Sequence, residues 1–157
     1  MQKITPFLWF DDQAEEAANF YVSLFKNSRI GQTVRYGDGG PGPTGQVMTI
    51  AFELDGLSFT ALNGGPMYKF TEAISLQVDC QDQAEIDDLW ARLTANGGQE
   101  SQCGWLKDRF GLSWQIVPAN MGDLLGGGDP AKSQRAMQAM LKMKKLDIAA
   151  LKAAREG

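Results

Sequence analysis

The hydrophobic pattern of the first half of the chain predicts a strand, a helix and three further strands. Residues 3–10 are rich in aromatic and β-favouring side chains and end at an acidic pair, which indicates a strand leading into a helix. Three strand-like runs follow the helix, at residues 29–36, 47–54 and 57–62. Asp55-Gly56, between the last two runs, is typical of a tight hairpin turn. The apolar positions at helical spacing are Ala14, Ala17, Ala18, Tyr21, Leu24 and Phe25.

The second half of the chain repeats this order. A strand is predicted at residues 73–80, followed by a helix that ends at Gly97-Gly98. Strands are then expected near residues 99–102 and at 103–107 and 112–117. The apolar face of this helix consists of Ile86, Leu89, Trp90 and Leu93.

Two capping-box patterns mark the starts of the two predicted helices. Asp12 is followed three residues later by Glu15, and Asp82 by Glu85. The patterns lie about seventy residues apart, which favours an internal duplication. Each unit alone would expose one face of its sheet, and this gives a physical reason for pairing two of them.

Beyond Pro118 the pattern becomes helical. Asp129-Pro130 is typical of a helix start, with the helix running to about residue 143, and Asp147 is expected to cap a last helix that ends near residue 155. An apolar stripe on the first of these helices must be buried either on its own sheet or on a partner subunit, and we expect the partner. The stripe consists of Ala136, Met137, Met140, Leu141 and Met143.

The composition narrows the function classes. With 157 residues, 43% hydrophobic and 22% charged, the chain suits one compact domain or two small modules sharing a core. A net charge of -4 argues against binding to nucleic acid, and no apolar run is long enough to cross a membrane. The first residues lack the pattern of a secretory signal, so we expect a cytoplasmic protein with both cysteines, Cys80 and Cys103, reduced.

Several motifs resemble those of PhnB-like proteins, a family of the glyoxalase, bleomycin-resistance and extradiol dioxygenase superfamily, also called vicinal oxygen chelate. The opening Ile4-Thr5-Pro6-Phe7-Leu8-Trp9-Phe10-Asp11 is similar to the start of these proteins. Further similar segments are Leu62-Asn63-Gly64-Gly65-Pro66, Cys103-Gly104-Trp105-Leu106-Lys107-Asp108, Phe110 through Pro118, and the tail segment Met143 through Ile148.

This resemblance implies an α+β fold in which two βαβββ modules form a curled mixed sheet, followed by a helical C-terminal tail. We expect residues 1–120 to form one glyoxalase-like domain, with modules at 1–66 and 67–120, and residues 121–157 to form the helical extension. The family also implies a homodimer that binds a small organic ligand.

Metal-using members of the superfamily place His or Glu on the first and last strands of their modules. This chain has no histidine. At the matching positions it offers Thr5 and Pro6, then Ala73 and Ser75, and finally Gln115 where Glu is common. Neutral amide and hydroxyl oxygens are weak ligands for a divalent ion. We therefore predict no catalytic metal and no cofactor.

PhnB-like proteins often carry the name 3-demethylubiquinone 3-methyltransferase. The segment from Gly37 to Gly42 matches the spacing G-x-G-x-x-G, which in other folds binds nucleotide cofactors at a strand-to-helix turn. Here Pro41 and Pro43 prevent entry into a helix, and a strand follows. We therefore interpret the segment as a hairpin loop or a lid, and the methyltransferase name as doubtful for this chain.

Strand alternation places residues two apart on one face. We expect a cleft lined by Phe7, Trp9 and Trp105, with Asn63 and Gln115 as hydrogen-bonding groups. Such a cleft suits a small, partly aromatic ligand. Purely structural roles are an open alternative. Both tryptophans are equally typical of a hydrophobic core, and Asn63 is equally typical of a turn.

No catalytic residue is identified. A metal-free isomerase, lyase or transferase would need a buried acid such as Glu53 or Asp79 with a raised pKa, or a reactive Cys103. Asp108 is interpreted as a turn residue. The favoured hypothesis is metal-independent binding of a small molecule; the alternatives are a metal-free enzyme, and a protein-interaction module using an exposed Met137 and Met140 stripe.

Overall fold

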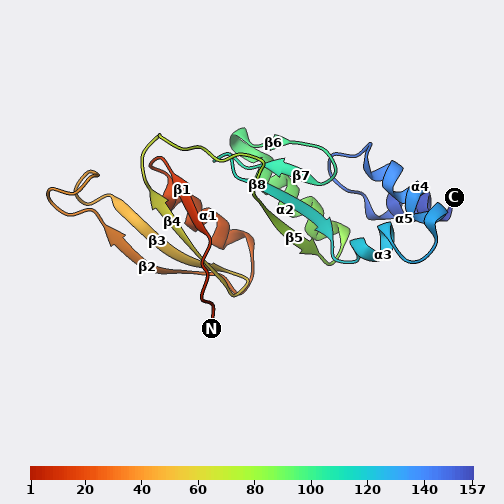
Figure 1. Cartoon of the computed structure of the whole chain (residues 1–157), viewed down its shortest axis with the longest axis horizontal. Helices are drawn as coiled ribbons and strands as arrows, with labels where there is room; N and C mark the ends of the chain where they lie inside the picture. The colour runs from red at the N-terminus through yellow and green to blue at the C-terminus, as the bar shows by residue number, and fades with distance from the viewer. The chain divides into compact units, whose positions relative to one another are not determined.

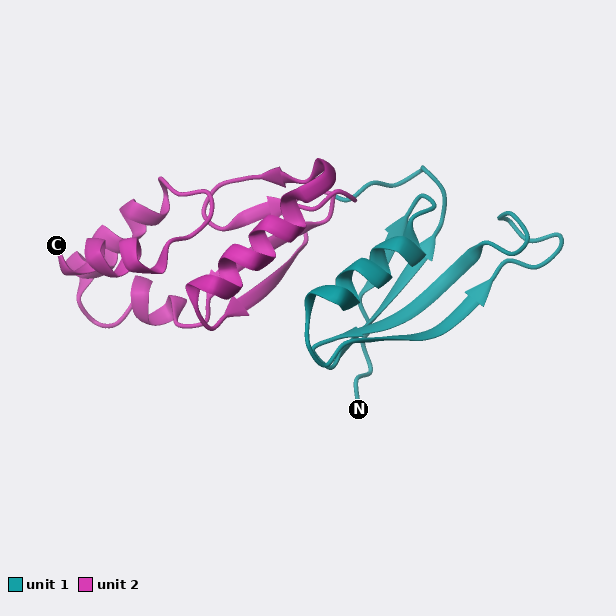
Figure 2. Ribbon diagram, turned by 180° about the vertical axis from the view of Figure 1, so that it is seen from behind, with its two compact units in different colours: residues 1–70 teal, residues 71–157 magenta.

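The computed structural model describes all 157 residues. The chain forms two compact units, Met1–Phe70 and Thr71–Gly157 (Figure 2). Each unit contains a four-stranded mixed sheet with a helix lying along it (Figure 1). The predicted α+β fold with two βαβββ modules and C-terminal helices is confirmed. None of the helices is both long enough and apolar enough to span a membrane.

The first unit follows the predicted element order. Its parts are β1 (Phe7–Phe10), α1 (Ala14–Leu24), β2 (Arg29–Arg35), β3 (Val47–Leu54) and β4 (Leu57–Asn63). The strand order is β1-β4-β3-β2, with β1 parallel to β4 and the other neighbours antiparallel. The turn before β4 is the predicted one, since Asp55 and Gly56 both adopt left-handed φ angles, of 49° and 81°.

The second unit repeats the topology. It contains β5 (Ser75–Cys80), α2 (Gln83–Thr94), a short 3-10 turn η1 (Ala95–Gly97), β6 (Gln99–Glu100), β7 (Trp105–Lys107) and β8 (Ser113–Pro118). The strand order β5-β8-β7-β6 corresponds strand by strand to that of the first unit. This equivalence supports the internal duplication.

Each sheet has one face packed under its helix and one face that this helix does not cover. In the first unit Tyr21 of α1 contacts Phe52 of β3, with ring centroids 6.2 Å apart. The cross-strand partner Phe59 is buried on the same face, and Leu8 and Phe10 are buried on β1. In the second unit the residues packed under α2 include Leu106, Trp114 and Ile116. We call the opposite faces the open face of the first sheet and the open face of the second sheet.

The two helices begin differently. Asp82 caps α2 as predicted, and its Oδ1 accepts a hydrogen bond of 2.9 Å from the backbone N–H of Glu85. The predicted cap of α1 by Asp12 is wrong. Gln13 occupies the N-cap position without a side-chain hydrogen bond, and Oδ1 of the distant Asn63 accepts from the N–H of Ala14 at 2.8 Å.

The tail consists of α3 (Met121–Leu125), α4 (Pro130–Met140) and α5 (Ile148–Glu156). Asp129 and Asp147 cap the last two helices as predicted. Met140 and Met143 pack against a cluster on their own chain, and Ala136 is fully buried within the same chain, so the prediction that the stripe is buried on a partner is wrong for these three residues. The cluster consists of Val117, Leu124, Leu146 and Leu151.

Candidate functional site

Polar side chains gather on the open face of the second sheet. Ser113 of β8 lies directly opposite Ser75 of β5 and Lys107 of β7. One step along β8, Gln115 lies opposite Gln77 and Trp105. Partners in register share a face, so these residues form two neighbouring rows across the sheet.

Trp105 and Gln115 form the centre of this surface. Both are half-buried, and Nε2 of Gln115 donates a hydrogen bond of 3.0 Å to Oγ of Ser75. This bond fixes the amide next to the indole ring and leaves the carboxamide oxygen as an acceptor. An aromatic surface beside an oriented amide can hold a small planar molecule by stacking and one or two hydrogen bonds.

Phe7 and Trp9 lie on the open face of the first sheet. Phe7 is 58% exposed, whereas Trp9 is half-buried and firmly held. Its indole N–H donates to the carbonyl of Gly65 at 2.9 Å, and its ring meets that of Tyr68 edge-on. The ring also packs on Gly64, where an added Cβ would come within 2.4 Å of it. Much of Trp9 therefore has a packing role.

Asn63 does not share a face with Phe7 and Trp9. It is 4% exposed and lies on the face packed under α1. Besides accepting from Ala14, its side chain donates to the carbonyl of Val47 at 3.0 Å. The side chain thus joins the start of α1 to the start of β3, and we leave Asn63 out of the proposed site below.

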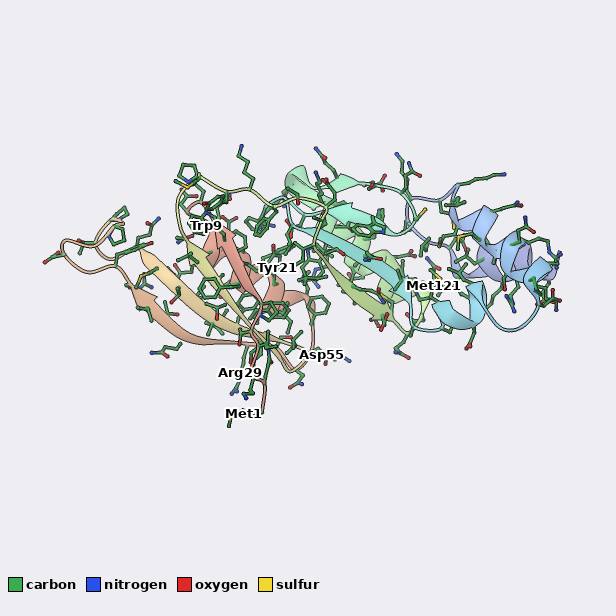
Figure 3. All side chains as sticks on the ribbon, in the orientation of Figure 1. Met1, Trp9, Tyr21, Arg29, Asp55 and Met121 are labelled. Carbon is green, nitrogen blue, oxygen red and sulfur yellow. The ribbon has the colours of Figure 1, made fainter.

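A shallow depression of about 290 Å³ lies elsewhere on the first unit. Arg29 and Glu53 belong to its lining and form a two-point ion pair, with N···O distances of 3.1 and 3.0 Å. Figure 3 shows Arg29 and Trp9 at opposite ends of this sheet. None of the residues predicted to line the ligand cleft lies here, although Glu53, considered as a general base, does. Its full lining is Arg29, Ile30, Gly31, Ala51, Phe52, Glu53 and Ser58.

The donor groups of the open faces do not fit a divalent metal ion. Gln115, which the resemblance predicted to stand at a metal-ligand position, donates to a serine hydroxyl. No three His, Cys, Asp or Glu side chains in the chain lie close enough together to hold an ion. A divalent ion beside Gln115 would depend mainly on neutral oxygens, which are weak ligands.

Neither Glu53 nor Asp79, the acids considered as general bases, is a buried carboxyl group, and Asp108 has a structural role. Glu53 pairs with Arg29, whose hydrogen bonds lower the pKa of the carboxyl group. Asp79 is exposed and accepts a hydrogen bond of 2.9 Å from Gln77. Asp108 is 3% exposed, but its carboxylate accepts from the N–H groups of Phe110 and Leu112, which is the predicted turn role.

Cys80 is expected to resist thiol reagents. It is 1% exposed, and burial raises the pKa of its thiol to about 12, with a smaller contribution from nearby acids. At pH 8 the reactive thiolate is then roughly one part in ten thousand. We predict that Ellman's reagent titrates Cys103 in the native protein and both cysteines after unfolding. Rapid labelling of Cys80 in a native Cys103→Ser variant would contradict this.

The two βαβββ modules, each with a mixed four-stranded sheet, define the fold class as glyoxalase-like. Residues 2–117 match the family model described as 3-demethylubiquinone-9 3-methyltransferase, so the chain belongs to this PhnB-like family. Among curated proteins, none matches the chain.

One solved structure gives the same family assignment, and others share the fold. The PhnB protein of Bacillus cereus, which carries the methyltransferase name, is 39% identical with a TM-score of 0.70, over 75% of this chain and 100% of that one. Protein PA1353 of Pseudomonas aeruginosa is 20% identical with a TM-score of 0.61, over 75% and 98%. The fosfomycin resistance protein FosX of Listeria monocytogenes, solved with Mn(II) and sulfate, is 13% identical with a TM-score of 0.52, over 78% and 95%. The last two show likeness of fold alone.

Two details qualify the family match for this chain. The matched region ends at residue 117, so α3, α4 and α5 lie outside it and the expected resemblance of the tail is not part of the match. The segment from Gly37 to Gly42 lies in the hairpin loop between β2 and β3, as predicted, and leads into a strand. It therefore lacks the helix N-terminus that a nucleotide-binding glycine loop requires.

Proposed function

We propose that this protein binds a small planar organic molecule on the open face of its second sheet, without a metal ion. Trp105 supplies an aromatic surface, and Gln115 a hydrogen-bonding amide. The observation that carries the proposal is the cross-strand pairing of these two residues on the face that α2 leaves uncovered, together with the Gln115–Ser75 hydrogen bond. FosX, which shares this fold, was solved with Mn(II) and sulfate, whereas the residues here do not favour a metal.

A titration with benzamide tests the proposal, because this probe is planar, aromatic and carries one amide. The indole N–H signals of the four tryptophans can be followed by ¹⁵N–¹H NMR. We expect the Trp105 signal to move, whereas those of the buried Trp90 and Trp114 serve as references. The signal of Trp9 reports whether the open face of the first sheet binds as well.

Two variants make the test specific. Trp105→Ala removes the stacking surface and should weaken benzamide about fivefold. Gln115→Leu removes the amide at similar volume and should weaken it about tenfold. Gln134→Leu, an exposed glutamine on α4, is the matched control and should change nothing. Because Trp105→Ala lacks the reporter signal, its affinity is measured by calorimetry. If benzamide moves no indole signal in the wild type, or binds equally well to the wild type, Trp105→Ala and Gln115→Leu, the proposal is wrong.

Native mass spectrometry tests the remaining parts of the proposal, a homodimer free of metal. We expect twice the chain mass with no stoichiometric divalent ion, and benzamide binding unchanged by EDTA. A retained ion whose removal abolishes binding would contradict metal independence. A monomer mass would contradict the dimer and leave the benzamide result to decide the site.

A further inference from the structure

Ser113 has an unusual environment on the open face of the second sheet. It is 1% exposed, and its Oγ has no hydrogen-bond partner. A buried hydroxyl without a partner destabilises the folded chain, because it has lost water and gained nothing in exchange. A bound molecule that presents an acceptor to this hydroxyl would remove that penalty.

A cation and a carboxylate lie next to this hydroxyl. Lys107 is the direct cross-strand partner of Ser113, and its ammonium group forms an ion pair with Glu72, which precedes β5. The side chains of Lys107 and Glu72 are 38% and 62% exposed. A carboxylate therefore already lies in front of Lys107, but it is held at the exposed surface, by Lys107 and by its own backbone N–H.

We infer that Lys107 and Ser113 form an oxyanion subsite beside Trp105 and Gln115, and that the ligand is a small planar organic acid. Its carboxylate replaces that of Glu72 on Lys107 and accepts a hydrogen bond from Ser113. This inference rests on the proposed function, because Trp105 provides the surface for the planar part.

The spacing of the two rows suits such a ligand. Lys107 and Trp105 are two residues apart on one strand and share a face, so their Cα atoms lie about 7 Å apart. An aromatic ring with a directly attached carboxylate spans that distance. Displacing Glu72 costs little, because ion pairs between exposed side chains are weak, whereas a charge-assisted hydrogen bond near a buried hydroxyl is stronger.

Benzoate and benzamide provide a matched pair of probes, since they have nearly the same shape and differ in charge. We expect benzoate to bind about tenfold more tightly in the Trp105 NMR titration, which corresponds to one charge-assisted contact. Lys107→Met and Ser113→Ala should each bring benzoate close to the affinity of benzamide. Gln134→Leu, the exposed control on α4, should leave the binding of both probes within about twofold of wild type.

Glu72→Gln distinguishes a ligand subsite from a structural ion pair. Removing the competing carboxylate should tighten benzoate about threefold, a change that a purely structural role would not produce. Equal binding of benzoate and benzamide would overturn the inference and leave the proposed function standing. Binding of neither probe would overturn both, and a benzoate preference that survives Lys107→Met and Ser113→Ala would overturn the subsite alone.

Discussion

Replacing Asp108 with alanine is expected to lower the free energy of unfolding by about 3 kcal/mol. Oδ1 of Asp108 accepts from the N–H groups of Phe110 and Leu112 at 2.9 and 3.1 Å, and Oδ2 accepts from the indole N–H of Trp114 at 2.9 Å. Leu112 and Trp114 are 0% and 1% exposed, so water cannot replace the lost acceptor at these two donors. The variant would leave both buried N–H groups without these partners.

Chemical denaturation followed by circular dichroism measures this loss. Asp108→Asn should lie between wild type and Asp108→Ala, because the amide oxygen keeps the backbone contacts while its NH₂ group faces the donor of Trp114. Asp88→Ala is the control, since Asp88 is an exposed acid on α2 with a 3.7 Å surface pair to Arg92, and it should change stability by no more than about 0.5 kcal/mol. Equal stabilities of the Asp108 and Asp88 variants would show that the turn does not depend on the carboxylate.

The spacing of apolar residues predicted the strands and helices of this protein well, because this spacing reflects which face of each element is buried. The strand at residues 47–54 has the predicted bounds, and the strand predicted at 57–62 extends one residue further, to Asn63. The strand predicted at residues 3–10 is shorter, since only Phe7–Phe10 pair with β4 in the sheet. The helix that was expected to end at Gly97-Gly98 ends earlier, at Thr94, and a 3-10 turn over Ala95–Gly97 follows, in which Gly97 adopts a left-handed φ of 108°.

Contacts between side chains far apart in the sequence could not be predicted from local patterns. The cap of α1 comes from Asn63, 49 residues from Ala14, and no i to i+3 pattern encodes such a contact. Strand alternation correctly grouped Asn63 with Phe59 and Ala61, but it does not say which face the helix covers. The unpaired hydroxyl of Ser113 likewise gave no sequence signal, since serine is common on strands with one exposed face.

The methionine stripe shows how amphipathic patterns leave the partner undetermined. The apolar spacing identified Met140 and Met143 as buried, but an apolar face packs equally well on its own chain or on another one. Backbone contacts decided the outcome here, because the carbonyls of Met143 and Lys144 accept from the N–H groups of Cys103 and Gly104, both at 2.8 Å. Leu141 remains 58% exposed.

The tail is therefore expected to be an integral part of the second unit, and Leu146 is its main anchor. Leu146 is 0% exposed and packs with Val117, the last-but-one residue of β8. The side chain of Gln83 binds the tail on both sides of this point, donating to the carbonyl of Leu146 at 3.0 Å and accepting from the N–H of Ile148 at 2.8 Å. These contacts tie the tail to α2 and to the sheet.

Replacing Leu146 with alanine should lower the free energy of unfolding by about 3 kcal/mol, because the change leaves a cavity in a packed apolar cluster. Leu141→Ala makes the same chemical change at an exposed position and should cost no more than about 0.5 kcal/mol. Hydrogen exchange locates the effect: the amides of Ile148, Cys103 and Gly104 should lose protection in Leu146→Ala, because their acceptors lie on Gln83 and on the tail. If both leucine variants were equally stable and kept this protection, the tail would be only loosely attached, and its Met140 and Met143 contacts would not contribute to the stability of the second unit.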